Sequence, residues 1–322
     1  MVMSEIRKRA GEEFASSDEV LSFLGADRCR LVYRLVRRKN VEGHAERAAD
    51  RAKGTSLFLL DYSTRSKSYP TVYEFPEDPI YKSFTPLLSP DGSRILYNHS
   101  FDATDMMILP IDGSEPVKIG FGANPRWCLD KESGNTYVVY RERNAKYNGA
   151  PQDGVTFRLQ VDENNIPIGE PEIVASYGFS GGMSIDGRYL CTAFLLVSSM
   201  DRQTGAISAP LGTVRQEPDR ENQCCCPSIA PDDTGRMMVL RWPHVRFSVM
   251  GWDGSGMTHY IIPEGATEWQ TPEWSTNPNF ATSSVMFSDE LIYDIMMINL
   301  STKEYLPITT DGGYVHAHLW VG

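Results

Sequence analysis

Short apolar runs separated by turn-forming residues make up most of the chain. In the clearest stretch, mostly apolar runs at 84–88, 94–97 and 106–111 are separated by Ser-Pro-Asp-Gly at 89–92 and followed by Asp-Gly-Ser at 112–114. Proline presets φ, an aspartate side chain bonds the backbone two residues on, and glycine accepts a positive φ. The pattern therefore predicts consecutive antiparallel strands joined by tight turns.

This arrangement of strands and turns recurs along the chain at a fairly regular spacing. Aligning position 86 with 125, 181, 227, 272 and 318 gives spacings of 39, 56, 46, 45 and 46 residues. Such a period is typical of the four-stranded blades of a β-propeller. The inner strands, one at the start of each blade, are then predicted near 82–89, 122–129, 178–185, 223–230, 268–275 and 313–321.

The last repeat has an inner strand at 313–321 and no strands after it, whereas strands at 29–36, 55–62 and 69–75 precede the first complete repeat. Pairing the two ends would remove an open sheet edge. We therefore expect an all-β, six-bladed propeller over residues 25–322, closed by its N- and C-terminal strands. Helical patterning is confined to about residues 4–24, so residues 1–24 are expected to form a short helical extension in which Ser17 and Asp18 cap the segment 19–24.

The Ser-Pro-Asp-Gly and Asp-Gly-Ser punctuation resembles the TolB-like (WD-repeat-like) β-propeller family over about residues 25–322. That family includes periplasmic interaction modules, the propellers of prolyl-oligopeptidase-type peptidases and the intracellular oligogalacturonate lyases. The turn motifs are informative about the fold and say little about function. The chain has no length left for the hydrolase domain that the peptidases append.

The charge and cysteine content narrow the function classes. A net charge of −11 argues against a nucleic-acid-binding protein, which normally carries a basic face. No run approaches the roughly 18 apolar residues of a membrane-spanning helix, and the N-terminus lacks the apolar stretch of a signal peptide. The six cysteines show no disulfide framework. A cytoplasmic location, with no membrane and no nucleic acid as partner, is therefore expected.

His316 and His318 are candidate metal ligands on the last inner strand. Residues two apart in a strand point to the same side, and the repeat alignment puts Gln270 and Cys225 level with His316. Such side chains suit a borderline divalent metal, and the candidates for the bound ion are Mn, Zn and Ca. Oligogalacturonate lyases hold a divalent metal with histidines and a glutamine, which His316, His318 and Gln270 resemble. His244 is a weaker candidate. The alternative is that the histidines only hydrogen-bond within the inner ring.

Several basic and aromatic residues are candidates for ligand contacts at the ends of predicted strands. Arginine suits bidentate recognition of carboxylate or sulfate, and aromatic rings can stack on sugars. The predicted ligand-binding residues are Lys82, Arg126, Trp269 and Tyr314, with Arg241, Arg246, Trp274 and Tyr177 as further candidates. Alternatively, the aromatic residues pack between blades and the arginines are merely solvated.

Two other motifs indicate structure more than chemistry. Gly-Phe-Ser-Gly-Gly at 178–182 matches the spacing of a nucleophile elbow, but a strand is predicted after it where the elbow needs a helix. The run Cys224-Cys225-Cys226 lacks the spacing of a zinc site, and packing is its expected role.

Two hypotheses of function remain open. In the first, the propeller channel binds a small anionic saccharide, and a bound metal would support lyase chemistry by stabilising charge on a uronate carboxylate while a base removes the adjacent proton. No residue is assigned as that base. In the second, the propeller is a non-catalytic module that binds another protein, which requires an exposed apolar patch of several hundred Å².

Overall fold

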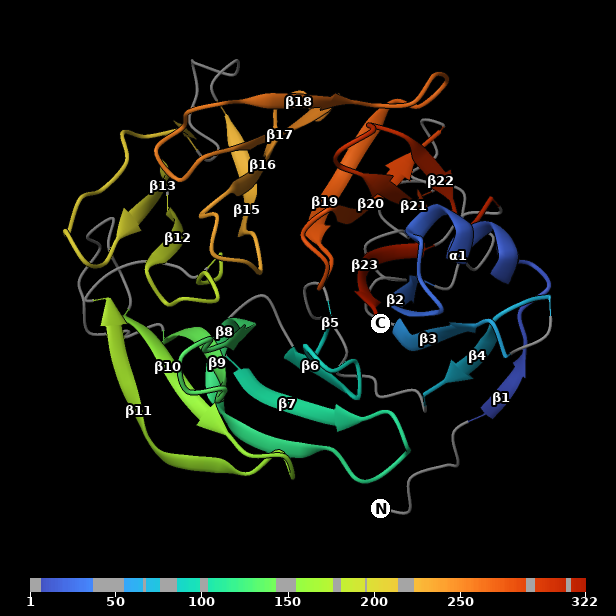
Figure 1. The fold of residues 1–322 in the computed structure, drawn as a ribbon, viewed down its shortest axis with the longest axis horizontal. Helices are drawn as coiled ribbons and strands as arrows, with labels where there is room; N and C mark the ends of the chain where they lie inside the picture. Colours follow the sequence, from blue (N-terminus) through green and yellow to red (C-terminus); the bar gives the residue numbers. More distant parts are fainter. Residues whose placement is uncertain are drawn as a thin grey trace, which may run out of the picture. The chain divides into compact units, whose positions relative to one another are not determined.

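The computed structural model describes residues 7–36, 55–65, 68–75, 86–98, 104–142, 155–175, 181–194, 196–213, 223–287, 293–310 and 314–322. Its regular structure is mostly antiparallel β-sheet (Figure 1). The chain divides into two compact units. Unit 1 comprises 1–100, 109–116 and 263–322, and unit 2 comprises 101–108 and 117–262.

Unit 1 joins the two ends of the chain in one five-stranded sheet. Its strands, in spatial order, are β1 (Arg7–Ala10), β4 (Thr71–Glu74), β3 (Thr55–Ser63), β2 (Arg28–Val36) and β23 (Tyr314–Val321). The expected pairing of 29–36 with 313–321 is present, with Cys29 opposite Val321 and Leu31 opposite Leu319. Leu31 and Leu319 lie in the buried core of this unit.

The rest of unit 1 consists of a four-stranded meander and a short hairpin. The meander contains β19 (Glu268–Trp274), β20 (Phe280–Met286), β21 (Tyr293–Asn299) and β22 (Tyr305–Pro307), and the hairpin contains β5 (Leu87–Leu88) and β6 (Arg94–Asn98). Each meander strand pairs with the next one along the chain, as the turn pattern predicts for a blade.

The N-terminal segment differs from the expected helical extension. Residues 7–10 form β1, which pairs with the free edge of β4, so its backbone groups gain partners in the sheet. The helix α1 (Ser17–Leu24) is capped by Ser16, not by Ser17: the Ser16 hydroxyl accepts from the Glu19 N–H at 3.3 Å, and the Glu19 carboxylate accepts from the Ser16 N–H at 3.0 Å. The helix ends at Gly25, whose φ is 62°.

Unit 2 is built from consecutive antiparallel strands. The first five residues of β7 (Thr104–Pro110) pair with β8, and β8 (Val117–Leu129) continues into a sheet with β9 (Thr136–Glu142), β10 (Val155–Val161) and β11 (Pro167–Ala175). A second sheet holds β12 (Tyr189–Phe194), β13 (Leu196–Asp201) and β14 (Gly212–Thr213). A third holds β15 (Cys224–Ile229), β16 (Met237–Arg241), β17 (Arg246–Met250) and β18 (Thr258–Ile261).

The turns form by the mechanism that the sequence predicts. The Ser89 hydroxyl donates to the Asp91 carboxylate at 2.5 Å, and the N–H of Ser114 donates to Asp112 at 2.9 Å. The N–H of Ser255 makes the same bond to Asp253 at 3.0 Å. Each aspartate thus accepts hydrogen bonds from the residues around its own turn, which lowers the pKa of Asp112 and Asp253.

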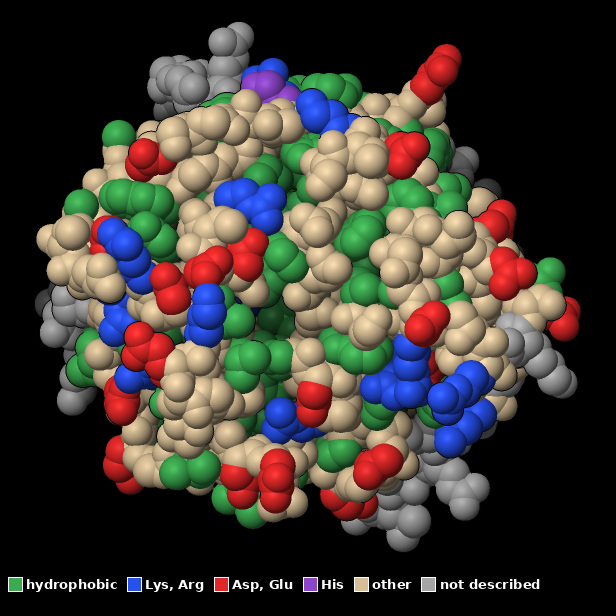
Figure 2. All heavy atoms as spheres, viewed as in Figure 1, with side chains coloured by type: hydrophobic (Ala, Val, Ile, Leu, Met, Phe, Trp, Pro, Cys, Tyr) green, Lys and Arg blue, Asp and Glu red, His purple; other side chains and the backbone are tan. Residues whose placement is uncertain are grey.

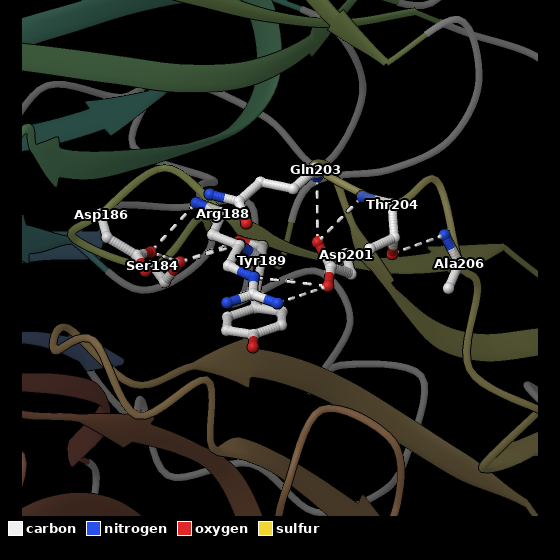
Figure 3. Close-up of polar contacts among 8 residues, drawn as sticks. All are labelled: Ser184, Asp186, Arg188, Tyr189, Asp201, Gln203, Thr204 and Ala206. Carbon is white, nitrogen blue, oxygen red and sulfur yellow. Dashed lines mark hydrogen bonds and ion pairs between the residues drawn. The ribbon is translucent and has the colours of Figure 1, made fainter.

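Figure 3 shows one of these turns extended into a larger polar network. The Ser184 hydroxyl donates to Asp186 at 2.5 Å, and the Arg188 guanidinium lies 2.9 Å from the Asp201 carboxylate. The backbone N–H groups of residues 203 and 204 also donate to Asp201. The bond from Arg188, followed by these backbone bonds, lowers the pKa of Asp201 to about 2. This network ties together the turns of one sheet.

Among the described residues, no helix is long and apolar enough to cross a membrane.

Candidate functional site

A β-bulge occurs at the same place in four of the predicted inner strands. One residue in each has a left-handed backbone: Asn124 (φ 49°), Cys226 (φ 51°), Thr271 (φ 45°) and His316 (φ 55°). At each bulge, two consecutive paired residues are three positions apart on the inner strand but only two positions apart on the neighbouring strand. Proline follows the left-handed residue in the first three, and proline lacks the N–H that a regular ladder would need.

The bulges correct the repeat alignment on which the metal hypothesis rests. His318 is equivalent to Glu273 and Ser228, because each is the first paired residue after its bulge. Gln270 and Cys225 are the last paired residues before theirs and are equivalent to Val315. The alignment that put them level with His316 is therefore wrong by one residue. The expectation that His316 and His318 point to the same side also fails, because residues two apart share a side only in a regular strand and the bulge lies at His316.

The structure places the four predicted metal ligands as follows. His318 is buried, and its Nδ1 accepts the N–H of Leu88 at 3.0 Å. The side-chain amide of Gln270 donates to Glu268. His316, His318 and Gln270 belong to unit 1, whereas Cys225 belongs to unit 2. In the part of the chain that the structure describes, no group of three or more His, Cys, Asp or Glu side chains could hold a metal ion. The metal site stays a prediction.

The structure describes only some of the predicted ligand-binding residues. Lys82 and Tyr177 lie outside the described residues, as does the side chain of Tyr314 on β23. Arg126 lies half-buried on β8, opposite Val139 on β9. Trp269 is 0% exposed, with its ring centroid 5.7 Å from that of Tyr305, and Trp274 is 2% exposed. Both indoles pack in the core, so neither has a ring face open to a sugar in this structure.

Two arginines flank the hairpin turn between β16 and β17. Arg241 is the last residue of β16 and lies directly opposite Arg246, the first residue of β17. Cys224 lies opposite Arg241 on β15, and Ile261 lies opposite Arg246 on β18. Residues opposite one another in antiparallel strands have side chains on the same face. Cys224, Arg241, Arg246 and Ile261 therefore form one row across the sheet, which we call the arginine row.

In the part of the chain that the structure describes, neither guanidinium of this row has an acidic partner. Among the described residues, no ion pair to a carboxylate involves Arg241 or Arg246, although the chain carries a net charge of −11. The Nε of Arg246 is buried and has no hydrogen-bond partner there. Like charges directly opposite in a sheet cost about 0.2–1 kcal/mol. An anion bound between the two side chains would remove this repulsion.

The surroundings of Arg241 position it without neutralising it. Its Nε donates to the hydroxyl of Ser248 at 3.2 Å, and that hydroxyl lies 2.8 Å from Nδ1 of His259. Ser248 and His259 lie opposite one another and form the next row on the same face of the sheet. A terminal nitrogen of Arg241 contacts the sulfur of Met257 at 3.6 Å. Ser248 and Met257 are uncharged, so neither of these contacts neutralises the positive charge of Arg241.

The turn between the two arginines adds an aromatic residue. Trp242 is 38% exposed, and its ring lies edge-on to the imidazole of His244 at 5.3 Å between centroids. Ile261 of the arginine row and Met257, which contacts Arg241, are exposed. The site thus combines apolar and aromatic surface with two arginines that pair with no carboxylate among the described residues, all within unit 2.

Part of this site was visible in the sequence. Arg241 and Arg246 were expected at strand ends, but the sequence does not show that they oppose one another, because this follows from the length of the turn at 242–245. Trp242 was not singled out. The signal that could have revealed it is its place between two arginines in Arg-Trp-Pro-His-Val-Arg at 241–246.

Comparison with known proteins identifies the fold of this chain. No family model and no curated protein matches the sequence. TolB from Acinetobacter baumannii matches the structure with a TM-score of 0.61 and 10% identity, over 94% of this chain and 70% of that one. A putative TolB from Agrobacterium tumefaciens matches with a TM-score of 0.52 and 13% identity, over 92% and 99% of the two chains.

An oligogalacturonate lyase from Vibrio parahaemolyticus also matches, with a TM-score of 0.41 and 14% identity, over 70% of this chain and 65% of that one. That likeness is too distant to bear on the chemistry of this chain. The two TolB structures, at 10% and 13% identity, are informative about the fold alone. In its fold this chain is a β-propeller similar to the TolB-like proteins, as its turn motifs predict.

Proposed function

We propose that the protein is a six-bladed propeller, closed by the pairing of β2 with β23, that binds a small anionic saccharide at the arginine row. The blade count is supported by the six repeats and by the recurring bulge of the inner strands. The observation that carries the binding proposal is that Arg241 and Arg246 oppose one another across two strands and pair with no carboxylate of the described segments.

The chemistry of the row favours a ring-bearing anion over a bare ion. Two guanidiniums match the paired oxygens of a carboxylate or sulfate, and each charge-assisted hydrogen bond contributes about 1.5–3 kcal/mol. Trp242 supplies an exposed ring of the kind that stacks on sugars, and Met257 and Ile261 supply apolar borders. A uronic acid or sulfated sugar presents both an anionic group and an apolar ring face. This assigns the predicted saccharide contacts to Trp242 instead of Trp269.

Binding of a uronic-acid disaccharide, measured by titration calorimetry, tests this function. We expect Arg241→Gln and Arg246→Gln each to weaken binding about 10- to 100-fold, the equivalent of the one charge-assisted bond each removes. Arg236→Gln is the matched control, because Arg236 is already paired with Asp232 at 3.1 Å. The proposal would be refuted if a disaccharide without the carboxylate bound as tightly as the uronic-acid disaccharide, or if both variants bound the latter as tightly as the parent does. Equal binding of sulfate alone would reduce it to a simple anion site.

The cytoplasmic location is also part of this proposal. All six cysteines are free, and four of them (Cys29, Cys128, Cys191 and Cys224) are buried. Free cysteines fit a reducing compartment.

A role in binding another protein is the alternative, and one observation favours it. Ile166, Ile168 and Ile173 are exposed on or beside β11, the edge strand of its sheet. On the face drawn in Figure 2, however, hydrophobic side chains are interspersed with charged and polar ones. If this strand binds a protein partner, Ile168→Thr with Ile173→Thr should abolish that association and leave the binding of the uronic-acid disaccharide unchanged. A partner that binds the double variant as tightly as the parent would exclude β11 as its site.

A further inference from the structure

A thiol and an imidazole meet beside the arginine row, on β15 and in the β16–β17 turn. The Sγ of Cys225 lies 3.5 Å from Nε2 of His244, and both residues are half-buried. Cys225 lies on the opposite face of the sheet from Cys224, because it opposes Leu240 and not Arg241. The thiol therefore lies on the other face from the arginine row, whereas the imidazole borders Trp242 of the proposed anion site.

The turn fixes the imidazole in this position. His244 has a left-handed backbone with φ 70°, and its N–H donates to the carbonyl of Arg241 at 2.6 Å. Its ring lies at 72° to the indole of Trp242. A histidine held by its backbone on one side and by an aromatic ring on another is oriented before any reaction begins.

The other cysteines lie in different environments. Burial raises the pKa of the Cys29, Cys191 and Cys224 thiols, and it raises that of Cys128 to about 12. Cys226 is half-buried like Cys225 but occupies the left-handed position of the bulge. Since only a thiolate is a good nucleophile, the four buried thiols are inert by comparison.

We propose that Cys225 is a reactive thiol, modified by soft electrophiles and oxidised by hydroperoxides, with His244 as its proton acceptor. The Sγ proton passes to Nε2 of His244, and the thiolate attacks the terminal oxygen of the hydroperoxide. An S–O bond forms as the O–O bond breaks, and the leaving alkoxide or hydroxide takes the proton back from His244. The sulfur is oxidised to the sulfenic acid and the hydroperoxide is reduced to an alcohol or water.

Limited alkylation of the folded protein with iodoacetamide, followed by mass spectrometry that resolves positions 225 and 226, tests this proposal. We expect Cys225 to react at least about tenfold faster than Cys226 in the same molecules. His244→Gln should slow Cys225 at least about tenfold and leave Cys226 unchanged. A merely structural role for His244 would alter both cysteines together, so the ratio of the two rates is the decisive readout.

His259→Gln is the matched control, because it removes a histidine of the same sheet that contacts Ser248 and leaves the Cys225 contact intact. A second measurement does not depend on the folding of the His244 variant: hydrogen peroxide with a sulfenic-acid trap should label the parent at position 225 and should not label Cys225→Ser. Equal rates at Cys225 and Cys226, an unchanged rate in His244→Gln, or equal trapping in Cys225→Ser would each overturn the proposal.

Discussion

Gly92, in the Ser-Pro-Asp-Gly turn at 89–92, lies beneath the indole of Trp320. Its φ is 69°, and an added Cβ would overlap the indole ring. The Trp320 Nε1–H donates to the carbonyl of Pro90 at 2.9 Å, and the Arg30 guanidinium donates to the carbonyl of Gly92 at 2.7 Å. Arg30 also lies over the Trp320 ring, 5.4 Å from its centroid. One small residue thus lets the turn, β2 and β23 meet.

Gly92→Ala should lower the free energy of unfolding by about 2–4 kcal/mol, because it combines a left-handed backbone with overpacking. Gly134→Ala is the matched control: its φ is 71°, but nothing lies within 4 Å of the added Cβ. That variant should lose only the backbone part, about 1–2 kcal/mol. Urea denaturation measures both changes, and equal losses would show that the contact with Trp320 has no energetic weight.

Asp201 makes stability depend on pH. Its pKa is lowered to about 2 in the folded protein, first by the bond from Arg188 and then by backbone N–H groups, whereas an unfolded aspartate titrates near about 3.9. A lowered folded-state pKa contributes stability above the unfolded value, and this contribution is lost as the pH falls from about 4 to about 2. Asp201→Asn should therefore be less stable at neutral pH and should show a flatter stability profile over that interval.

Thermal unfolding of the parent and Asp201→Asn across this pH range provides the measurement. Arg188→Gln should have an intermediate profile, because it removes the largest cause of the shift and leaves the bonds from residues 203 and 204. Parallel profiles for the parent and Asp201→Asn would contradict this account.

At the scale of elements, the inner strands show what a sequence reveals and what it hides. Strand positions follow from the apolar runs and turn motifs, and they agree with the structure at β8, β15 and β19. The inner strand expected at 178–185 does not form over its described residues 181–185, which make only an isolated bridge from Met183 to Leu190. The bulges do not follow, although Pro125, Pro227 and Pro272 within predicted strands are a recognisable sign of them. The last repeat has alanine at the corresponding position 317, so the alignment moved to 318 and misplaced the metal candidates.

The side chains of the candidate site were harder to predict for a physical reason. Which residues oppose one another depends on turn length and register, and a shift of one residue moves every side chain to the other face. Arg241 and Arg246 meet only because the turn at 242–245 brings them into register. Trp269 looked like a ligand contact because aromatic residues suit both sugars and cores, and only its burial distinguishes the two roles.

The strand β23 should be indispensable to unit 1. It pairs with β2, its Ala317 carbonyl accepts from the Thr282 hydroxyl at 2.7 Å, and its Leu319 carbonyl accepts from the Thr276 N–H at 3.0 Å. Deleting residues 314–322 would expose the β2 edge and part of the core. We expect loss of cooperative unfolding, measured by calorimetry. Val321→Ala, which keeps the strand, should cost less than about 1.5 kcal/mol. Unchanged thermal unfolding of the deletion would disprove the role of β23.

At the scale of the whole molecule, the anion proposal and the metal hypothesis predict different responses to chelation. The arginine row requires no metal, so dialysis against a chelator should leave the affinity for the uronic-acid disaccharide unchanged. A metal held by His316 and His318 would instead be lost from His316→Ala and His318→Ala and detectable by metal analysis of the parent. A chelator-sensitive affinity, restored by adding back a divalent cation, would favour the metal site over the arginine row.

The pairing of β2 with β23 also bears on how the protein is made. The two strands are separated by almost the whole chain, so the sheet that begins with β1 to β4 stays incomplete until residues 314–321 have been synthesised. At ribosomal rates, the interval between the end of β4 and the end of β23 is on the order of ten to fifty seconds. During this time β2 presents an unpaired edge to the cell. A nascent chain with such an edge is a natural client for chaperones and is exposed to aggregation until its last strand arrives.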